Sequence, residues 1–313
     1  MFQRLKNVLS NNQPSTPTLS QVPYYVVEHD QRKQVKQGTI DWYTGAIKTL
    51  LASVGDDILI TELRVSDLRK WQKEQEDAHM VSTVNARKRS IQSQLNKLAV
   101  LGLLPSYRDN GRTVANITDC IHFKPEGRKT CRAMTEETYK ALFARADLKW
   151  RTILCVMWHS GIRRAELCSM RTDKLKFWEN EAGELCTEFH VKGKMDMPRW
   201  VACKGQPAEM LQDWVENQRP RKTPNKYVFM GDGLKPMGLS TVNSAFRRYA
   251  KSAGIPDTEI SNPHSMRHHY ALWLLDRGLA VNVAAAAMGI DPSTFLENYV
   301  TPHDNQVREA LLS

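Results

Sequence analysis

The residues best suited to chemistry lie in the second half of the chain: Arg163, Lys194, His264, Arg267 and Tyr299. Two guanidinium groups can clamp the nonbridging oxygens of a phosphate under in-line attack, and Arg163 and Arg267 are the candidates for this role. A tyrosine hydroxyl, with an ordinary pKa of about 10, attacks only when arginines favour the phenolate or a base takes its proton. His264 can be that base or a partner of the phosphate. The set predicts transfer of a DNA phosphate to Tyr299.

The composition predicts a folded protein with a polyanionic partner. A length of 313 residues indicates about two domains, and a hydrophobic content of 41% suffices for ordinary cores. The net charge of +10 and the isoelectric point of about 9.3 favour nucleic acid or an acidic membrane surface, through counterion release. No apolar run is long enough to span a bilayer, and residues 1–21 lack the hydrophobic stretch of a signal peptide. We therefore expect an intracellular protein.

The cysteines form no CxxC pair, which predicts reduced and mostly buried thiols and argues against a disulfide framework or zinc. There are six of them: Cys120, Cys131, Cys155, Cys168, Cys186 and Cys203.

Helical spacing of apolar residues predicts a first, helical domain over residues 22–104. One helix is expected between an N-cap at Thr39 and a stop at Gly55. A second is expected after Ser66, and a third over about residues 83–101.

The third of these helices has an apolar and a basic side. Its apolar side predicts contact with the core and consists of Val84, Ile91, Leu95 and Leu98. Its other side can contact phosphates and base edges in a major groove, or can be a merely solvated basic face. That side carries Arg87, Lys88, Arg89, Gln92, Ser93 and Asn96.

Two segments are expected to lack regular structure. Residues 1–21 contain a polar run with prolines and predict a flexible tail. Residues 105–132 contain prolines, Asp109-Asn110-Gly111 and Pro125-Glu126-Gly127, and predict an extended linker.

The second domain, over residues 133–313, is predicted to be mixed. Thr135 opens a helix, and a buried helix around residues 153–158 leads into Gly161, which turns the chain and presents Arg163. Strand-like runs at 177–191 and 199–203 predict a small antiparallel sheet with Lys194 in its second turn. Further helices are expected at 240–254 (carrying the candidate DNA-contacting residues Arg247 and Arg248), at 264–277, at 281–288, and from Asp291-Pro292 to about Tyr299. The expected fold is mainly α with a small antiparallel β-sheet.

The second domain resembles the catalytic domain of the tyrosine recombinases, the family of phage integrases and Xer recombinases. The resemblance lies in Gly161-Ile162-Arg163 with Glu166-Leu167, in Gly193-Lys194, in His264 to His268 with the pattern H-x-x-R-H, and in the terminal Tyr299. Each box alone would occur in many proteins, but four in this order are specific. Residues 22–104 resemble the helical core-binding domain of the family in pattern only.

The resemblance implies a site-specific recombinase with a mixed α+β catalytic domain and a helical core-type domain. Such an enzyme cuts and rejoins double-stranded DNA at specific recombination sites, as a homotetramer and through a Holliday junction. Tyr299 would form a 3′-phosphotyrosyl link, and Lys194 would protonate the leaving 5′-hydroxyl. No metal, ATP or organic cofactor is required, and a need for accessory DNA-bending proteins is left open. The protein would act in the cytoplasm of a bacterial or phage-infected cell, at the nucleoid.

Two assignments have a neighbouring competitor. Arg163 could instead pair structurally with Glu166, and Arg164 beside it shifts the choice by one position, but the Gly-Ile-Arg register favours Arg163. Lys192 competes with Lys194, which the Gly-Lys pair and an arginine downstream favour.

The histidines and tyrosines also have a second interpretation. His264 and His268, one helical turn apart and next to His269, could bind a metal, but this requires a third ligand and an arginine between them. Tyr270 competes with Tyr299 as nucleophile, although its position after the histidines favours a place in the core.

One position departs from the family. Met288-Gly289-Ile290 stands where these enzymes usually have Leu-Gly-His, so Ile290 replaces a histidine or tryptophan that hydrogen-bonds the scissile phosphate. Either that contact is dispensable in this protein or another group supplies it.

Two rival functions use the same fold. A non-catalytic DNA-binding regulator would not need the five intact residues of the catalytic set. A type IB topoisomerase shares the chemistry without exchanging DNA partners. The apolar residues beyond Tyr299 (Val307, Ala310 and Leu311) favour the recombinase, because such a segment docks into a neighbouring subunit in that family.

Overall fold

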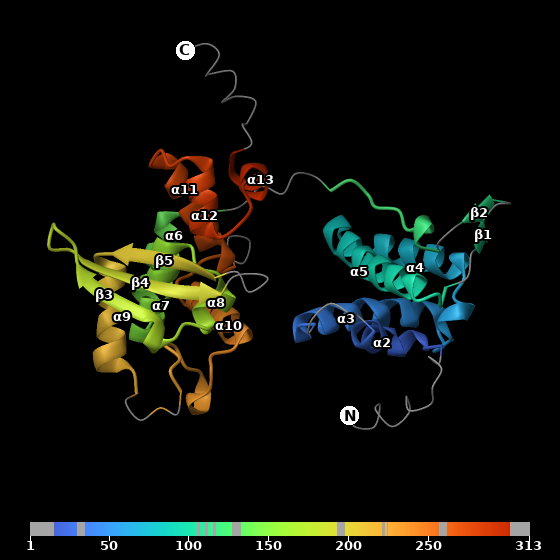
Figure 1. The fold of residues 1–313 in the computed structure, drawn as a ribbon, viewed down its shortest axis with the longest axis horizontal. Coiled ribbons are helices and arrows are strands. Elements are labelled where there is room, and N and C mark those ends of the chain that lie inside the picture. The colour runs from blue at the N-terminus through green and yellow to red at the C-terminus, as the bar shows by residue number, and fades with distance from the viewer. Residues whose placement is uncertain are drawn as a thin grey trace, which may run out of the picture. The chain divides into compact units, whose positions relative to one another are not determined.

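The structure, a computed structural model, forms two compact units, residues 1–129 and 130–313, which we call the N-terminal and C-terminal domains (Figure 1). It describes residues 16–29, 35–104, 107–109, 112–114, 117–126, 133–192, 198–220, 223, 225–256 and 262–300. For residues 107–109, 112–114, 192 and 198 it describes the backbone alone.

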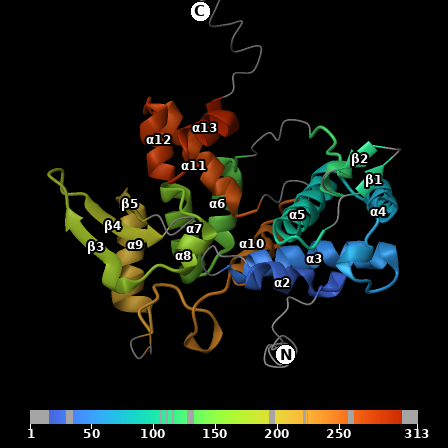
Figure 2. The ribbon, with the colours of Figure 1, turned by 45° about the vertical axis from the view of Figure 1, so that its right-hand side comes forward.

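The N-terminal domain is a bundle of helices (Figure 2). Their apolar side chains form one core. Its helices are α2 (Val22–Glu28), α3 (Gln37–Val54), α4 (Val65–Ala78) and α5 (Val81–Val100). Helices α3, α4 and α5 pack on one another, and α2 packs on α3 and α5. Strands β1 (Tyr107–Asp109) and β2 (Arg112–Val114) form a short antiparallel pair.

The apolar side predicted for α5 is confirmed. Val84, Ile91, Leu95 and Leu98 are all buried. Gly55 ends α3 as predicted, with a φ of 97°. The predicted N-cap of α3 is wrong, because the helix begins two residues before Thr39. The carbonyl oxygen of Lys36 accepts the Thr39 N–H at 2.9 Å, so the chain has already turned at Lys36.

The structure corrects the described parts of both segments that were expected to lack structure. In the predicted tail, Leu19 is fully buried in the N-terminal core and begins a 3-10 helix, Leu19–Gln21. In the predicted linker, residues 117–121 belong to the same core, because Ile117, Cys120 and Ile121 are buried there. The amide of Gln72 donates to the carbonyl oxygen of Cys120 at 3.0 Å and fixes this segment. Burial of scattered apolar residues outweighs the polar, proline-containing context on which both predictions relied.

The C-terminal domain combines helices with one antiparallel sheet in the order β3-β4-β5. The strands are β3 (Leu175–Glu179), β4 (Leu185–Lys192) and β5 (Pro198–Lys204), which confirms the predicted sheet. Helices α7 and α9 pack against each other and against the sheet (Figure 1). The helices are α6 (Glu136–Arg145), α7 (Leu148–Ser160), α8 (Arg164–Cys168), α9 (Gln206–Asp213), α10 (Leu239–Ser252), α11 (His264–Asp276), α12 (Val281–Met288) and α13 (Pro292–Phe295).

Several helix starts follow from their capping residues. Thr135 Oγ1 accepts the Thr138 N–H at 3.2 Å at the start of α6, and Asp291 Oδ1 accepts the Ser293 N–H at 2.9 Å before α13. Both starts confirm the prediction. Helix α10 instead begins at Leu239, one residue before the predicted start. A π-helical turn, Leu296–Val300, continues α13 to Tyr299.

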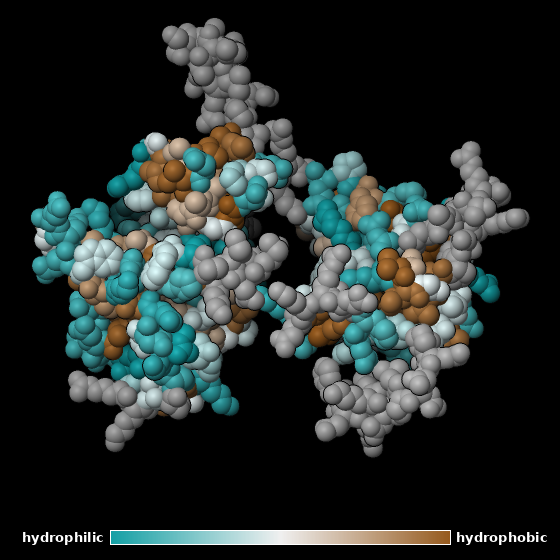
Figure 3. All heavy atoms as spheres, in the orientation of Figure 1, coloured by the Kyte–Doolittle hydropathy of each residue, from teal (hydrophilic) through white to brown (hydrophobic). Residues whose placement is uncertain are grey.

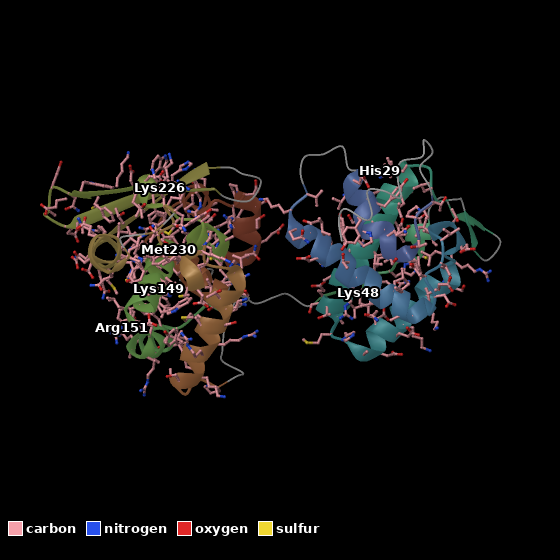
Figure 4. The ribbon with its side chains drawn as sticks, turned by 90° about the horizontal axis from the view of Figure 1, so that it is seen from below. His29, Lys48, Lys149, Arg151, Lys226 and Met230 are labelled. Carbon is pink, nitrogen blue, oxygen red and sulfur yellow. The ribbon has the colours of Figure 1, made fainter. Side chains whose placement is uncertain are left out.

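Helix α7 is the central element of this domain and carries mostly buried residues. At its start, Lys149 donates from Nζ to the backbone oxygen of Met230 at 3.4 Å, and the two residues lie close together in Figure 4. Its end leads directly into Gly161. The position of the residues after Gly161 is therefore tied to the main core.

Helices α11, α12 and α13 enclose a second, smaller core of this domain. Its fully buried members are Ala271, Ala284, Ala285, Met288 and Phe295, with Leu274 at 3% exposure. On the outside of the same elements, Leu272, Val283 and Leu296 are exposed, and the space-filling view has hydrophobic surface at this end of the domain (Figure 3). This part of the molecule therefore has apolar surface as well as an apolar core.

The cysteines that the structure describes are buried, as predicted: Cys120, Cys155, Cys168, Cys186 and Cys203. Cys131 lies outside the described residues. In the described part of the chain, no helix is both long and apolar enough to cross a membrane.

Candidate active site

Gly161 makes the turn that presents Arg163. It ends α7 in the left-handed region, with φ 57° and ψ 22°. A Cβ at this position would lie 2.9 Å from Cγ of Tyr270 and 3.1 Å from Sδ of Met288. Only glycine fits both the backbone conformation and the space. Arg163 then stands at the N-cap of α8, in extended conformation.

A buried carboxylate holds two arginines together. Glu166 is 2% exposed. Its Oε1 accepts a hydrogen bond from Nη1 of Arg163 at 2.7 Å, and its Oε2 accepts one from Nη2 of Arg199 at 2.8 Å. Burial alone would raise the pKa of Glu166, but Arg199 and Arg163 outweigh it and hold that pKa below its ordinary value. The carboxylate is therefore ionised at neutral pH.

Backbone carbonyl groups at the end of α12 accept further hydrogen bonds from both arginines. Arg163 donates from Nη2 to the carbonyl oxygen of Gly289 at 2.7 Å, and Arg199 donates from Nη1 to that of Ala287 at 2.5 Å. Gly289 has a φ of 61°, and a Cβ there would lie 2.5 Å from Cδ of Arg199. In the sequence, Arg199 was identified only by its spacing after the Gly-Lys pair. Its position after the Gly-Lys turn was the available signal for a role in the site.

Arg267 lies beneath the surface of the site. It is 3% exposed and donates from Nη1 to the carbonyl oxygen of Gly161 at 2.6 Å and from Nη2 to that of Met288. Burial, then Arg163 and Arg199, lower the pKa of Arg267 to about 9. Two arginines and a buried third thus place concentrated positive charge at one point of the domain.

Arg163 and His264 line one cleft with a volume of about 430 Å³. The side chain of Arg163 is 23% exposed, so it can contact a ligand while it is paired with Glu166. Burial, then Arg267, Arg163 and Arg164, lower the pKa of His264, which favours the neutral ring. The full lining is Met157, Ile162, Arg163, Arg164, Ala165, Leu239, Asn243, Asn262, Pro263 and His264.

Tyr299 contacts His268, which lies on α11 one helical turn after His264. Nδ1 of His268 lies 2.9 Å from the Tyr299 hydroxyl oxygen, within hydrogen-bond distance. The ring of Phe295 lies 4.9 Å from that of Tyr299, centroid to centroid, and supports its orientation. In the sequence, His268 was identified as the last residue of the H-x-x-R-H pattern and as a possible metal ligand, without a catalytic role. Its place one helical turn after His264 was the signal for a second histidine in the site.

Two of the positions considered in the sequence, Ile290 and Tyr270, do not join this cluster. Ile290 packs against the small core of α11, α12 and α13, and its N–H donates to the carbonyl oxygen of Ala285 at 3.1 Å. Tyr270 packs under Gly161, and burial raises its pKa, which fits the expected core residue. Lys194 lies outside the described residues, as does the side chain of Lys192.

No metal site takes shape among the residues that the structure describes, where no three His, Cys, Asp or Glu side chains come together suitably. His264 and His268 contact each other edge to face, with ring centroids 4.6 Å apart.

One candidate DNA contact needs correction. Lys88 is fully buried, and its ammonium lies 2.5 Å from Glu76 and 2.6 Å from the carbonyl oxygen of His122. Lys88 lies four residues after Val84 and three before Ile91, so it falls on the packed face of α5 and is not a DNA-contacting residue. Arg89 is half exposed and pairs with Glu126 at 2.9 Å. Arg87 is partly exposed and donates to Gln75.

The remaining two candidates lie on α10. Arg247 and Arg248 are exposed, and Arg248 donates to the hydroxyl of Tyr249 at 3.1 Å.

The family profile described as the phage integrase family matches residues 132–306, more than half of the chain. The chain belongs to this family. Among curated relatives, the tyrosine recombinase XerA of Pyrococcus furiosus is 24% identical over 186 residues, which cover 58% of this chain and 60% of the relative. A tyrosine recombinase of Pseudothermotoga lettingae is 30% identical over 137 residues, 44% of each chain. The chain thus spans about half the length of the curated relatives that it matches.

Solved structures share the fold at lower identity. The XerH site-specific recombinase, bound to palindromic difH substrate in a post-cleavage complex, has a TM-score of 0.69 at 14% identity, covering 99% of this chain and 87% of that one. The Tn1549 transposon integrase, in complex with circular intermediate DNA, has a TM-score of 0.66 at 17% identity, with coverage of 94% and 99%. These likenesses establish the fold, mainly α with a small antiparallel sheet and a tyrosine recombinase catalytic domain.

Proposed function

We propose that this protein is a site-specific DNA recombinase that cleaves and rejoins strands through a 3′-phosphotyrosyl link at Tyr299. The observation that carries the proposal is that Arg163 and His264 line the same cleft. The buried Arg267 donates to the carbonyl oxygen of Gly161, in the turn that presents Arg163. Tyr299 lies within hydrogen-bond distance of His268, on the helix that carries His264. An anionic phosphate in the cleft would face Arg163 directly. Family membership supports the same function.

The reaction requires each of these groups in a definite role. The tyrosine oxygen attacks the phosphorus, the bond to the 5′-oxygen breaks, and that oxygen takes up a proton from Lys194. Arg163 stabilises the charge on the nonbridging oxygens, and Arg267 strengthens the positive potential from below. The phosphotyrosyl link retains the bond energy, so a second DNA end can reverse the step. No metal, ATP or organic cofactor takes part.

The proposed partner is double-stranded DNA with specific recombination sites, on which the protein acts as a homotetramer through a Holliday junction. The net charge of +10 and the exposed Arg247 and Arg248 support binding to a polyanion. The exposed apolar residues Leu272, Val283 and Leu296 provide surface for contact between subunits.

Covalent trapping tests the proposal. The protein is incubated with a nicked suicide substrate that loses the fragment carrying the 5′-hydroxyl, and the adduct is sought on a denaturing gel. We expect an adduct with the wild type and with Tyr270→Phe, a matched loss of one hydroxyl, and none with Tyr299→Phe. Absence of the wild-type adduct, or its survival in Tyr299→Phe, would exclude the proposal.

A strand-exchange assay then distinguishes a recombinase from a topoisomerase and from a non-catalytic DNA-binding regulator. A pair of labelled recombination sites gives recombinant products and Holliday junctions with a recombinase. Relaxation of supercoils without exchange would instead indicate topoisomerase activity, and sequence-specific binding without any adduct would indicate a regulator.

A further inference from the structure

The two histidines at the start of α11 have different neighbours. His264 lines the cleft that Arg163 and Arg164 also line. His268, one helical turn later, lies with Nδ1 2.9 Å from the Tyr299 hydroxyl oxygen, and the two rings are 5.6 Å apart, centroid to centroid. One histidine therefore faces the place of the phosphate, and the other faces the nucleophile.

We propose that His268 is a catalytic residue that accepts the proton of Tyr299 as its oxygen attacks, while His264 contacts the phosphate. The O–H bond of Tyr299 breaks, its proton passes to Nδ1 of His268, and the new bond forms between the tyrosine oxygen and phosphorus. The P–O5′ bond breaks in the same displacement, and the 5′-oxygen is protonated by a separate acid. This inference deepens the proposed recombinase activity and rests on it.

The surroundings of His268 suit a proton acceptor. To accept the phenol proton, Nδ1 must carry a lone pair, which the neutral ring with its proton on Nε2 provides. Burial, then His264 and Arg267 on the same helix, lower the pKa of His268 to about 4, so the ring is neutral at pH 7. A phosphodiester in the cleft adds negative charge nearby, which raises that pKa and favours proton uptake once DNA is bound.

The geometry of Tyr299 is fixed from two sides. Phe295, within α13, contacts one side of the tyrosine ring, and His268 holds the hydroxyl. Among the titratable and charged groups around His268 are His264 and Arg267 from α11 and Tyr299 from the turn after α13. Burial, then Arg267, Arg163 and Arg164, also lower the pKa of His264, and His264 is in turn one of the groups that lower the pKa of His268.

A single-turnover measurement of adduct formation tests the inference. His268→Asn places an amide oxygen near the position of Nδ1, where it can accept a hydrogen bond but cannot take a proton. His268→Ala removes both abilities. His269→Asn is the matched control, because His269 lies on the same helix but stacks on Trp158 at 3.5 Å and does not contact Tyr299 in any described hydrogen bond. DNA affinity and thermal midpoint are measured for each variant.

We expect His268→Asn and His268→Ala to slow adduct formation at neutral pH by about 100-fold or more, with little change in DNA affinity. Their rates should climb as the pH approaches the tyrosine pKa of about 10, since ionisation then replaces the base. His269→Asn should react like the wild type.

Three outcomes would overturn the inference. A normal rate in His268→Asn with a slow rate in His268→Ala would mean that His268 only positions the hydroxyl. Normal rates in both would mean that it has no role, and an equally slow His269→Asn would indicate a general disturbance of α11. In all three, an adduct that depends on Tyr299 would leave the proposed recombinase activity intact, whereas failure of that activity would appear as an adduct in Tyr299→Phe or none in the wild type.

Discussion

Arg267 donates a hydrogen bond to the carbonyl oxygen of Gly161 over 2.6 Å, although 106 positions separate the two residues in the chain. The contact joins the helix that carries both site histidines to the turn that presents Arg163. It requires a turn at Gly161 that no other residue can make without strain. The two arginine-containing boxes of the sequence are thus one structural unit.

We expect Gly161→Ala to lower the free energy of unfolding by about 3 kcal/mol, from the left-handed backbone and the clash with Tyr270. Adduct formation should fall as well, because Arg163 and the acceptor of Arg267 both move. Gly45→Ala is the control: Gly45 lies within α3 with open space around it, and alanine there should add about 0.5 to 1 kcal/mol. Calorimetric unfolding measures both, and an unchanged stability in Gly161→Ala would contradict the geometry.

Glu166→Gln should destabilise the C-terminal domain by about 3 kcal/mol, because Arg163 and Arg199 lose a buried counter-charge. Glu188→Gln breaks a partly exposed pair with Lys176 at 2.9 Å and should cost under about 1 kcal/mol. Equal losses in the two variants would mean that burial of Glu166 adds nothing to its interaction with the arginines.

The same carboxylate predicts the direction of a pH dependence. Because the folded-state pKa of Glu166 lies below its unfolded value, the unfolded chain takes up the proton first. The stability that Glu166 contributes is therefore fully present above the unfolded pKa of about 4.3 and is lost as the pH falls through the lower folded pKa. Denaturant unfolding in acid should accordingly show a smaller dependence on pH for Glu166→Gln than for the wild type. A steeper dependence in the variant would be inconsistent with a lowered pKa.

Lys88→Met should destabilise the N-terminal domain by about 2 kcal/mol, while Glu76 keeps its 2.7 Å pair with Lys124. It should leave the salt dependence of DNA binding unchanged, because the ammonium of Lys88 is buried. Arg247→Ala should instead lower the slope of log K against log salt by about 0.9, as expected for one lost phosphate contact. Filter binding over a salt series compares them, and a reduced slope in Lys88→Met would restore that lysine as a DNA contact.

Lys194→Ala should slow adduct formation on ordinary DNA by about 100-fold or more, if Lys194 protonates the leaving 5′-oxygen. A substrate with sulfur at that bridging position should restore the rate, because a thiol with a pKa of about 8.5 leaves without protonation. Lys192→Ala is the matched control and should behave like the wild type on both substrates. Rescue of Lys192→Ala in place of Lys194→Ala would shift the assignment by two positions.

The apolar pattern of the sequence was enough to predict several regular elements around the site, although not α8 and α9. The C-terminal bounds of α7, the strands of the sheet and the extent of α12 follow from local spacing, capping and glycine positions. The tail and the linker could not be predicted in the same way. Leu19 and Ile117 gain their stability from distant partners, which a local window does not contain.

The sequence by itself determined the residue types of the site, their order and the family that they define, because the chemistry of phosphate transfer demands particular side chains in a recognisable register. Only the tertiary structure decided which of those side chains face one another. In the tertiary structure, Arg199 pairs with Glu166, and Lys88 is buried. The hydroxyl of Tyr299 lies within hydrogen-bond distance of His268. Such pairings depend on distances between segments far apart in the chain, and packing of the whole domain sets those distances.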